Sequence, residues 1–304
     1  MRPKVTLLER QEQVVATRAR RRAVGLSAMS VAAVTLLGGC DVGSAFGGFG
    51  WPQGGITEQS QRMYDLWIGS VVAAMLVGVF VWGLIFWCIG MYRRGKVGSE
   101  LPTQTRFNLP IEILYTVLPF LVISVLFYYT AVIQTDVNKV SANPDVTVDV
   151  VAFKWNWQFN YPEGNAIDAP VVESTVGDSS YIPIVVIPIN RTVRFREHSQ
   201  DVIHSFWVPE LLFKRDVFPG SVYNEFQVTA TQEGHFVGRC AELCGTYHSM
   251  MNFELRTVTP EKFAQYVAAL KAGKTTPEAL TAIGEAPYAT TTVPFPTKRD
   301  ADKG

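Results

Sequence analysis

A short stretch around residue 240 contains four side chains of the types that bind soft metal ions. Cys240, Cys244, His248 and Met251 follow one another at the spacing C-x3-C-x3-H-x2-M, and His204 stands 36 residues before the first cysteine. Thiolate, thioether and imidazole ligands together favour copper over harder cations. One cysteine would indicate a single copper ion, whereas a second cysteine four residues on allows two thiolates to bridge two ions. The pattern therefore predicts a two-copper electron-transfer centre.

Other uses of these residues stay open on the sequence alone. The two cysteines and two histidines could instead form a tetrahedral zinc site, or the cysteines could form a disulfide. A disulfide would leave both histidines and Met251 without a role. Met251 favours copper over zinc, although methionine is also a common core residue. The chain has only two further histidines, His198 and His235, which we expect at the surface and at the start of a strand.

The N-terminal residues have the features of an export signal. Residues 1–39 hold seven basic and two acidic side chains; the basic part ends at Arg22 and an apolar stretch follows over residues 23–37. Fifteen apolar residues are short for a membrane span but suit a signal peptide. The small residues before Cys40 resemble a bacterial lipobox. We therefore predict a lipoprotein signal peptide over residues 1–39, cleaved before Cys40, with Cys40 as the lipid anchor; an uncleaved signal anchor is the alternative.

Two apolar stretches predict transmembrane helices over residues 67–92 and 111–133. Each has an uncharged run long enough to cross a hydrocarbon core of ~30 Å, and aromatic residues gather near their ends. The connector, residues 93–110, is basic, so it should face the cytoplasm. This topology makes the chain a multi-pass protein of a bacterial cell membrane. Residues 40–66 and everything from residue 134 to the C-terminus would then lie on the external side.

The pattern changes to short alternating strands from about residue 145 onwards, with turn signals between them. Such a series predicts an antiparallel sandwich or barrel. Within it, the polar residues 161–180 are expected to form a loop insertion. Residues 260–304 should comprise a helix capped by Thr259 and a mobile tail. The 27 basic and 27 acidic residues balance, and no nucleic-acid partner is expected. The sequence has no C-x2-C-H motif, which excludes covalently attached haem.

Several segments together resemble subunit II of cytochrome c oxidase. They are residues 112–119, Trp155-Asn156-Trp157, residues 201–209, Pro219-Gly220 and residues 240–251, which fall in the family's order over roughly residues 60–260. The resemblance implies a transmembrane helical hairpin followed by an all-β cupredoxin-like Greek-key barrel at residues 134–259. It also implies an activity: electrons from cytochrome c enter at a dinuclear CuA centre and pass to haem in subunit I, where oxygen is reduced to water and protons are translocated.

The same resemblance assigns the metal ligands. Cys240 and Cys244 would bridge two copper ions. The coordination shells would be completed by His204, His248, Met251 and the backbone carbonyl of Glu242. The Glu242 side chain would face a magnesium or manganese ion shared with subunit I, and haem would be bound only in subunit I.

Further roles follow from the resemblance. Trp155 would be the point of electron entry, and Glu112 a residue near the entrance of a proton path. Asp201 would be either a docking carboxylate or a turn residue. The expected partners are oxidase subunits I and III, membrane lipid, and cytochrome c or a membrane-attached c-type cytochrome within a supercomplex. Tyr115, Ser221 and the length of residues 161–180 depart from the usual family pattern. The length of this segment and the expected lipid anchor suggest a variant built for a larger assembly.

Two other functions compete with this one. A copper-free quinol oxidase subunit II would keep the β domain, but it would have no need of both cysteines. A periplasmic-side copper-delivery protein would favour few, exchangeable ligands, whereas five candidate side chains indicate retention of the metal.

Overall fold

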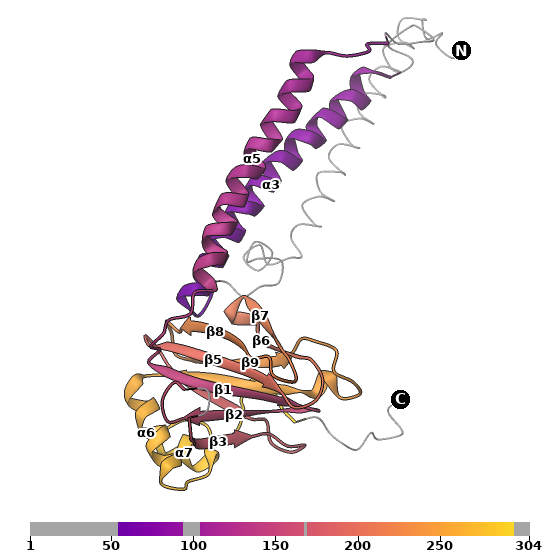
Figure 1. The fold of residues 1–304 in the computed structure, drawn as a ribbon. Helices are drawn as coiled ribbons and strands as arrows, with labels where there is room; N and C mark the ends of the chain where they lie inside the picture. The colour runs from indigo at the N-terminus through magenta and orange to yellow at the C-terminus, as the bar shows by residue number, and fades with distance from the viewer. Residues whose placement is uncertain (1–53, 94–103, 167–168, 295–304) are drawn as a thin grey trace, which may run out of the picture. The chain divides into compact units, whose positions relative to one another are not determined.

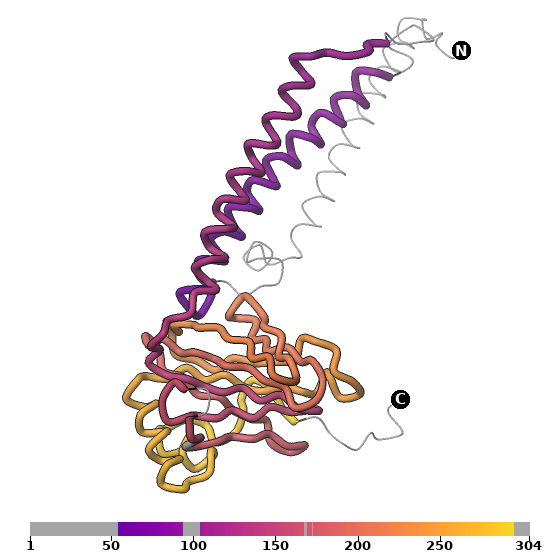
Figure 2. Tube along the Cα trace, in the orientation of Figure 1, coloured from indigo at the N-terminus to yellow at the C-terminus, as the bar shows by residue number. Residues whose placement is uncertain are grey.

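The computed structural model describes residues 54–93, 104–166 and 169–294 of the chain (Figure 1). Two long helices, α3 (Glu58–Met91) and α5 (Leu109–Val137), precede a domain built mainly of strands, and Figure 2 follows the same path as a trace. The predicted fold class, a helical pair followed by an all-β domain, is confirmed. The predicted signal peptide, Cys40 and most of the connector between the two helices lie outside the described residues.

Both helices are longer than predicted: α3 begins nine residues earlier, whereas α5 begins two residues earlier and ends four residues later. Thr57 caps α3: its hydroxyl accepts from the N–H of Ser60, and the Ser60 hydroxyl accepts in turn from the N–H of Thr57. In α5 the Asn108 side chain caps the first turn, and Pro110 occupies a position where no N–H is needed. Residues 58–66, expected in an external segment, therefore belong to α3. Both helices are long and apolar enough to cross a membrane.

The strands form two five-stranded sheets. One has the order β3-β2-β1-β5-β8, from β1 (Val146–Phe153), β2 (Asn156–Pro162), β3 (Val171–Val176), β5 (Thr192–Ser199) and β8 (Asn224–Thr229). The other has the order β4-β10-β9-β6-β7, from β4 (Ile184–Pro188), β6 (His204–Val208), β7 (Phe213–Val217), β9 (Gly234–Cys240) and β10 (Asn252–Val258).

Strand pairing differs from the antiparallel expectation at two places. β1 pairs with β5 in parallel, and β4 pairs with β10 in parallel. The cause is the path of the chain, which crosses to the second sheet through β4 before it returns to the first sheet as β5. The β domain is thus a sandwich of two mixed sheets.

Aromatic rings fill the space between the two sheets. Trp157 on β2 and Phe195 on β5 contribute from one sheet, and Phe206 on β6 and Phe253 on β10 from the other; all four are at most 1% exposed. Ring centroids lie 5.3 Å apart for Trp157 and Phe253 and 5.5 Å for Phe195 and Phe206. Aromatic pairs of this kind contribute about 0.5–1.5 kcal/mol each beyond the area they bury. They fix β2 relative to β6 and β10.

The polar segment at residues 161–180 is not wholly a loop, which corrects the expectation from sequence. Val171–Val176 forms β3, which pairs with β2 and makes the edge of its sheet. Tyr161, at the end of β2, is buried; its hydroxyl donates to the Val186 carbonyl and accepts from the Val186 N–H. The β-branched residues of Val171–Val176 were the available signal for this strand.

The helix expected at residues 260–272 is present as α6 (Pro260–Lys271), with Thr259 as its N-cap and Tyr266 and Leu270 buried. The residues after it were expected to be mobile, and this is wrong for those that the structure describes. A second helix, α7 (Thr276–Ala282), follows, and the C-terminal segment (residues 283–294) then packs on the β domain.

A buried ion pair on β10 holds this C-terminal segment. Glu254 and Arg256 are fully buried, and the Arg256 guanidinium donates to the Glu254 carboxylate at 2.7 Å. Arg256 also donates to the carbonyls of Ala286 and Tyr288, while Glu254 accepts from the backbone N–H groups of the two threonines at positions 290 and 291. Each buried charge thereby finds its remaining partners only when the segment is docked.

Replacing Arg256 with methionine is expected to lower the free energy of unfolding by about 3–5 kcal/mol, because the Glu254 carboxylate would stay buried without its partner. The C-terminal segment should also become a site of proteolytic cleavage. Thermal unfolding and limited proteolysis of the full chain in detergent measure both effects. Lys262→Met is the control, since Lys262 makes a half-exposed pair with Glu285 of the same segment and should cost less than about 1 kcal/mol. Equal effects of the two substitutions would contradict the buried-pair explanation.

Candidate metal centre

The loop between β9 and β10 folds back on itself and brings its four candidate ligands together. β9 ends at Cys240 and β10 begins at Asn252, and the Cys240 N–H donates to the Met251 carbonyl at 3.1 Å. Between them, Gly245 has a φ of 121°, a conformation that favours glycine. A Cβ at Gly245 would lie 3.2 Å from the Trp155 indole nitrogen, so a side chain there would also crowd that ring.

Strand pairing places the distant histidine beside this loop. His204 is the first residue of β6, and β6 pairs with β9 so that Phe206 lies opposite Cys240. The Ala241 N–H donates to the Ser205 carbonyl at 3.0 Å, which continues the contact into the loop. His204 is fully buried. His204 and Cys240, 36 positions apart in the sequence, therefore lie on adjacent strands.

The donor atoms of these residues converge. The Cys240 and Cys244 sulfurs are 3.8 Å apart; the Cys240 sulfur lies 3.8 Å from His204 Nδ1, and the Cys244 sulfur lies 3.6 Å from His248 Nδ1. The Met251 sulfur is 3.9 Å from the Cys244 sulfur, and the Glu242 carbonyl oxygen is 3.3 Å from the Cys240 sulfur. The six residues expected as ligands thus lie together in this structure, each with a donor atom within 3.9 Å of another's.

These separations fit bound metal. Nitrogen and sulfur donors at ~2.0–2.3 Å from one tetrahedral ion lie about 3.3–3.8 Å from each other. The two thiols are free, and their separation of 3.8 Å is well beyond the ~2.05 Å of a disulfide. Each thiol has its own imidazole neighbour, so the arrangement offers two coordination positions joined by two sulfurs.

Burial sets the protonation of the ligands. Burial, and after it the neighbouring Cys240 thiol, raises the pKa of the Cys244 thiol to about 12. This thiol is therefore protonated at neutral pH in the metal-free chain, and a metal ion must displace its proton. Since thiolate is the binding form, metal affinity should rise with pH. Burial also lowers the pKa of His204, which favours the neutral imidazole that binds metals.

Asp201 orients the His204 ring. Its Oδ1 lies 2.8 Å from His204 Nε2, which leaves Nδ1 to face the Cys240 sulfur. Its Oδ2 accepts from the Lys154 N–H at 2.7 Å, in the turn that carries Trp155. The sequence suggested a docking role or a turn role for Asp201. The Asp-x-x-His spacing was the signal that could have revealed this hydrogen bond to a candidate ligand.

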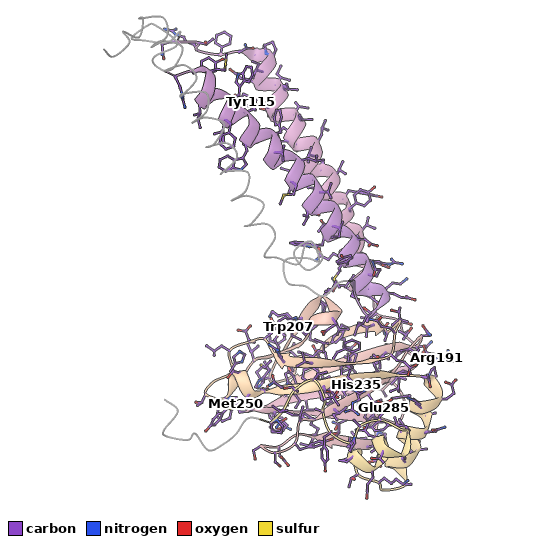
Figure 3. The ribbon with its side chains drawn as sticks, turned by 180° about the vertical axis from the view of Figure 1, so that it is seen from behind. Tyr115, Arg191, Trp207, His235, Met250 and Glu285 are labelled. Atoms are coloured by element: carbon purple, nitrogen blue, oxygen red, sulfur yellow. The ribbon has the colours of Figure 1, made fainter. Side chains whose placement is uncertain are left out.

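Trp155 contacts the loop directly. Its indole N–H donates to the Cys244 carbonyl at 3.2 Å, and its ring meets Tyr247 edge-on at a centroid distance of 4.9 Å. Both rings line an open cavity of about 800 Å³, together with Met250 (labelled in Figure 3), Ile182 and Pro294. Trp155 is only half-buried, so its indole ring lies between the candidate centre and the solvent.

The remaining predicted residues lie outside the cluster. The Glu242 carboxylate is half-exposed and lies 3.8 Å from Lys214 Nζ. Glu112 is in the first turns of α5, where its carboxylate accepts from the Asn108 N–H at 2.9 Å. His198 stacks on Tyr223.

His235 is not a candidate ligand in this structure. It lies beside Glu285, with 2.8 Å between its Nε2 and the carboxylate (Figure 3). It is the second residue of β9, close to the strand start at which the sequence placed it.

Comparison with known proteins gives consistent matches. A family model described as the periplasmic domain of cytochrome c oxidase subunit II matches residues 146–258. A probable cytochrome c oxidase subunit 2 from Nocardia farcinica is 43% identical, over 91% of this chain and 89% of that protein. Cytochrome c oxidase subunit 2 from Mycobacterium tuberculosis is 42% identical, over 91% and 90%. The solved periplasmic domain of subunit II from Bradyrhizobium japonicum is 28% identical, with a TM-score of 0.38, and covers 45% of this chain and all of that one.

Removing the Asp201 carboxylate is expected to weaken copper binding, because His204 would lose the hydrogen bond that orients it. Loss of such an outer partner lowers metal affinity by about 10- to 100-fold. Competition with a copper chelator, on the full chain in detergent, measures the effect in Asp201→Ala. Asp178→Ala is the control: Asp178 also accepts backbone N–H groups in an exposed turn beside the same cavity, but it contacts no candidate ligand. Similar affinities for the two variants would show that Asp201 does not orient His204.

Proposed function

Because this chain belongs to the cytochrome c oxidase subunit II family, we propose that its β domain receives electrons from a c-type cytochrome at a dinuclear copper centre. As a subunit of cytochrome c oxidase, the chain would pass these electrons to haem in subunit I, where oxygen is reduced. The observation that carries the proposal is the pair of thiols 3.8 Å apart, each with an imidazole nitrogen within 3.8 Å.

In this proposal Cys240 and Cys244 bridge two copper ions. Their other donors are the side chains of His204, His248 and Met251 and the carbonyl of Glu242. Bound copper would supply one-electron transfer at this position. The protein's own contribution is rigidity: the donors come from a loop closed by backbone hydrogen bonds and from the adjacent strand β6. Fixed donors need little rearrangement when the charge at the centre changes by one electron.

Trp155 is the proposed point of electron entry. The ring is half-exposed on the cavity side, and its N–H reaches the carbonyl of Cys244, one of the proposed bridging ligands. An electron arriving at this ring would therefore have one hydrogen bond to cross before it reached the backbone of a ligand. The neighbouring Tyr247 holds the indole edge-on and restricts its orientation.

The membrane arrangement is proposed from the sequence and the two apolar helices. α3 and α5 would span a bacterial cell membrane, with the basic connector in the cytoplasm and the copper domain and C-terminus outside. Residues 1–39 would be a signal peptide and Cys40 a lipid anchor. Residues 134–259 would form the copper domain, and residues 260–304 would extend it.

Further assignments are proposed on family resemblance. The proposed partners are subunits I and III and a soluble or membrane-attached cytochrome. The Glu242 carboxylate, beside Lys214, would face a magnesium or manganese ion shared with subunit I. Glu112 would lie near a proton path, although its present hydrogen bond is that of a helix-capping residue.

Two alternatives explain the site less well. A copper-free quinol oxidase subunit would not need two free, buried thiols beside two imidazoles. A copper-delivery protein would favour accessible ligands, yet His204, Cys240, Cys244 and Met251 are all at most 8% exposed. Burial of this kind favours retention of the metal.

Replacing Cys244 with serine is expected to abolish the two-copper centre, because a hydroxyl is a poor ligand for copper and cannot bridge as a thiolate does. Copper per chain should fall from two to at most one, and the electron spin resonance pattern of an unpaired electron shared by two ions should disappear, together with oxidase turnover. Cys88→Ser, at a free cysteine in α3, should change none of these. A preserved two-copper spectrum in Cys244→Ser would remove this residue from the ligand set.

Replacing Trp155 with phenylalanine is expected to slow electron uptake from a reduced c-type cytochrome by about tenfold, equivalent to about 1.4 kcal/mol of barrier. The smaller ring loses both the N–H and part of the exposed surface, whereas all copper ligands remain. Stopped-flow reduction of the copper-loaded chain in detergent, with copper content determined in parallel, measures the change. Trp207→Phe, on β6, is the matched control. Unchanged uptake at normal copper content would place the entry point elsewhere.

A further inference from the structure

A second tryptophan, Trp157, contacts the candidate metal centre from the opposite sheet. It lies on β2 and is fully buried, with its ring between the two sheets. Ring centroids lie 6.2 Å away for His204, 6.0 Å for Phe206 and 5.3 Å for Phe253. The side chain thus packs against β6 and β10 at the ends where candidate ligands are attached. None of the roles proposed above uses it.

The polar atom of this side chain has one specific partner. The Trp157 indole N–H donates to the backbone carbonyl of Met251 at 3.1 Å. The same carbonyl accepts from the Cys240 N–H, also at 3.1 Å. Two donors from different sheets therefore fix the Met251 backbone at the point where the loop enters β10. Met251 is 1% exposed, and its sulfur lies 3.9 Å from the Cys244 sulfur.

We propose that Trp157 is a positioning residue for the copper centre, and that it acts by holding the Met251 backbone so that the thioether reaches the metal. This inference rests on the proposed function. A thioether is a weak ligand, so its contribution depends on where the backbone places it. A carbonyl oxygen accepts two hydrogen bonds, and loss of the indole donor would leave the Cys240 N–H in place. The loss therefore acts mainly on the position of Met251.

The test is Trp157→Phe in the full chain in detergent, loaded with copper. Phenylalanine keeps an aromatic ring at this position and removes the N–H. We expect two copper ions per chain, a shifted hyperfine pattern and reduction potential, and about tenfold weaker copper retention against a chelator, as for loss of other outer partners of metal ligands. In a Met251→Leu background the same substitution should cause no further change, because no thioether remains to be positioned.

Phe159→Leu is the matched control. Phe159 lies two residues along β2, is fully buried and also packs on Phe206 and Phe253. It should lower the melting temperature of the metal-free chain without changing copper retention or the spectrum. If Trp157→Phe does not fold, benzothienylalanine at position 157 provides the bicyclic shape without the N–H and carries the same expectation.

The outcomes separate this inference from the proposed function. Unchanged copper retention and spectrum in the variant without the N–H would overturn the positioning role. The same conclusion would follow if Phe159→Leu altered them equally, or if the effect persisted without Met251. A wild-type chain that failed to bind two copper ions would instead overturn the proposed function.

Discussion

The pairing of β9 with both β6 and β10 is the constraint on which the candidate metal centre depends. β9 ends in Cys240, β6 begins with His204, and β10 begins just after Met251. Three strand termini therefore lie side by side at the same end of one sheet. The loop needs only to turn back from β9 into β10. The first sheet supports this end through two indole rings. Trp157 and Trp155 each donate a hydrogen bond to a backbone carbonyl of the loop.

The chemistry of the site was predictable because soft ligands are rare and their spacing was short. Four of the candidate ligands lie within twelve residues, so no fold knowledge was needed to group them. His204 was harder to place, since only strand pairing brings it across 36 residues. The long apolar helices were evident from hydrophobicity, whereas their true starts depended on caps such as Thr57, which a search for apolar runs does not weigh.

The errors concern segments whose order depends on distant partners. Residues 283–294 were expected to be mobile because they belong to a C-terminal segment rich in Thr, Pro, Ala and Lys. They are held instead by Glu254 and Arg256, whose charges alternate along a strand and look solvent-exposed in sequence. β3 was read as loop because an edge strand needs only one neighbour and tolerates polar residues. Trp157 was missed as a partner of the centre, because a hydrogen bond between separate elements has no local sequence pattern. Asp201 was missed although its spacing of three residues from His204 is local.

In the metal-free chain, the protonation of Cys244 lowers the cost of burying the candidate ligands. Two buried thiolates side by side would repel each other and lose their hydration, but burial and the neighbouring thiol hold the pKa of Cys244 near 12. The Cys244 thiol is therefore neutral in the metal-free chain, and burying it costs less than burying a thiolate would. A bound metal ion would replace the Cys244 proton at a loop already held by hydrogen bonds to the Met251 carbonyl and the His204 ring. The same burial would slow the loss of a bound metal ion, since a departing ion would have to pass packed side chains and be replaced by protons.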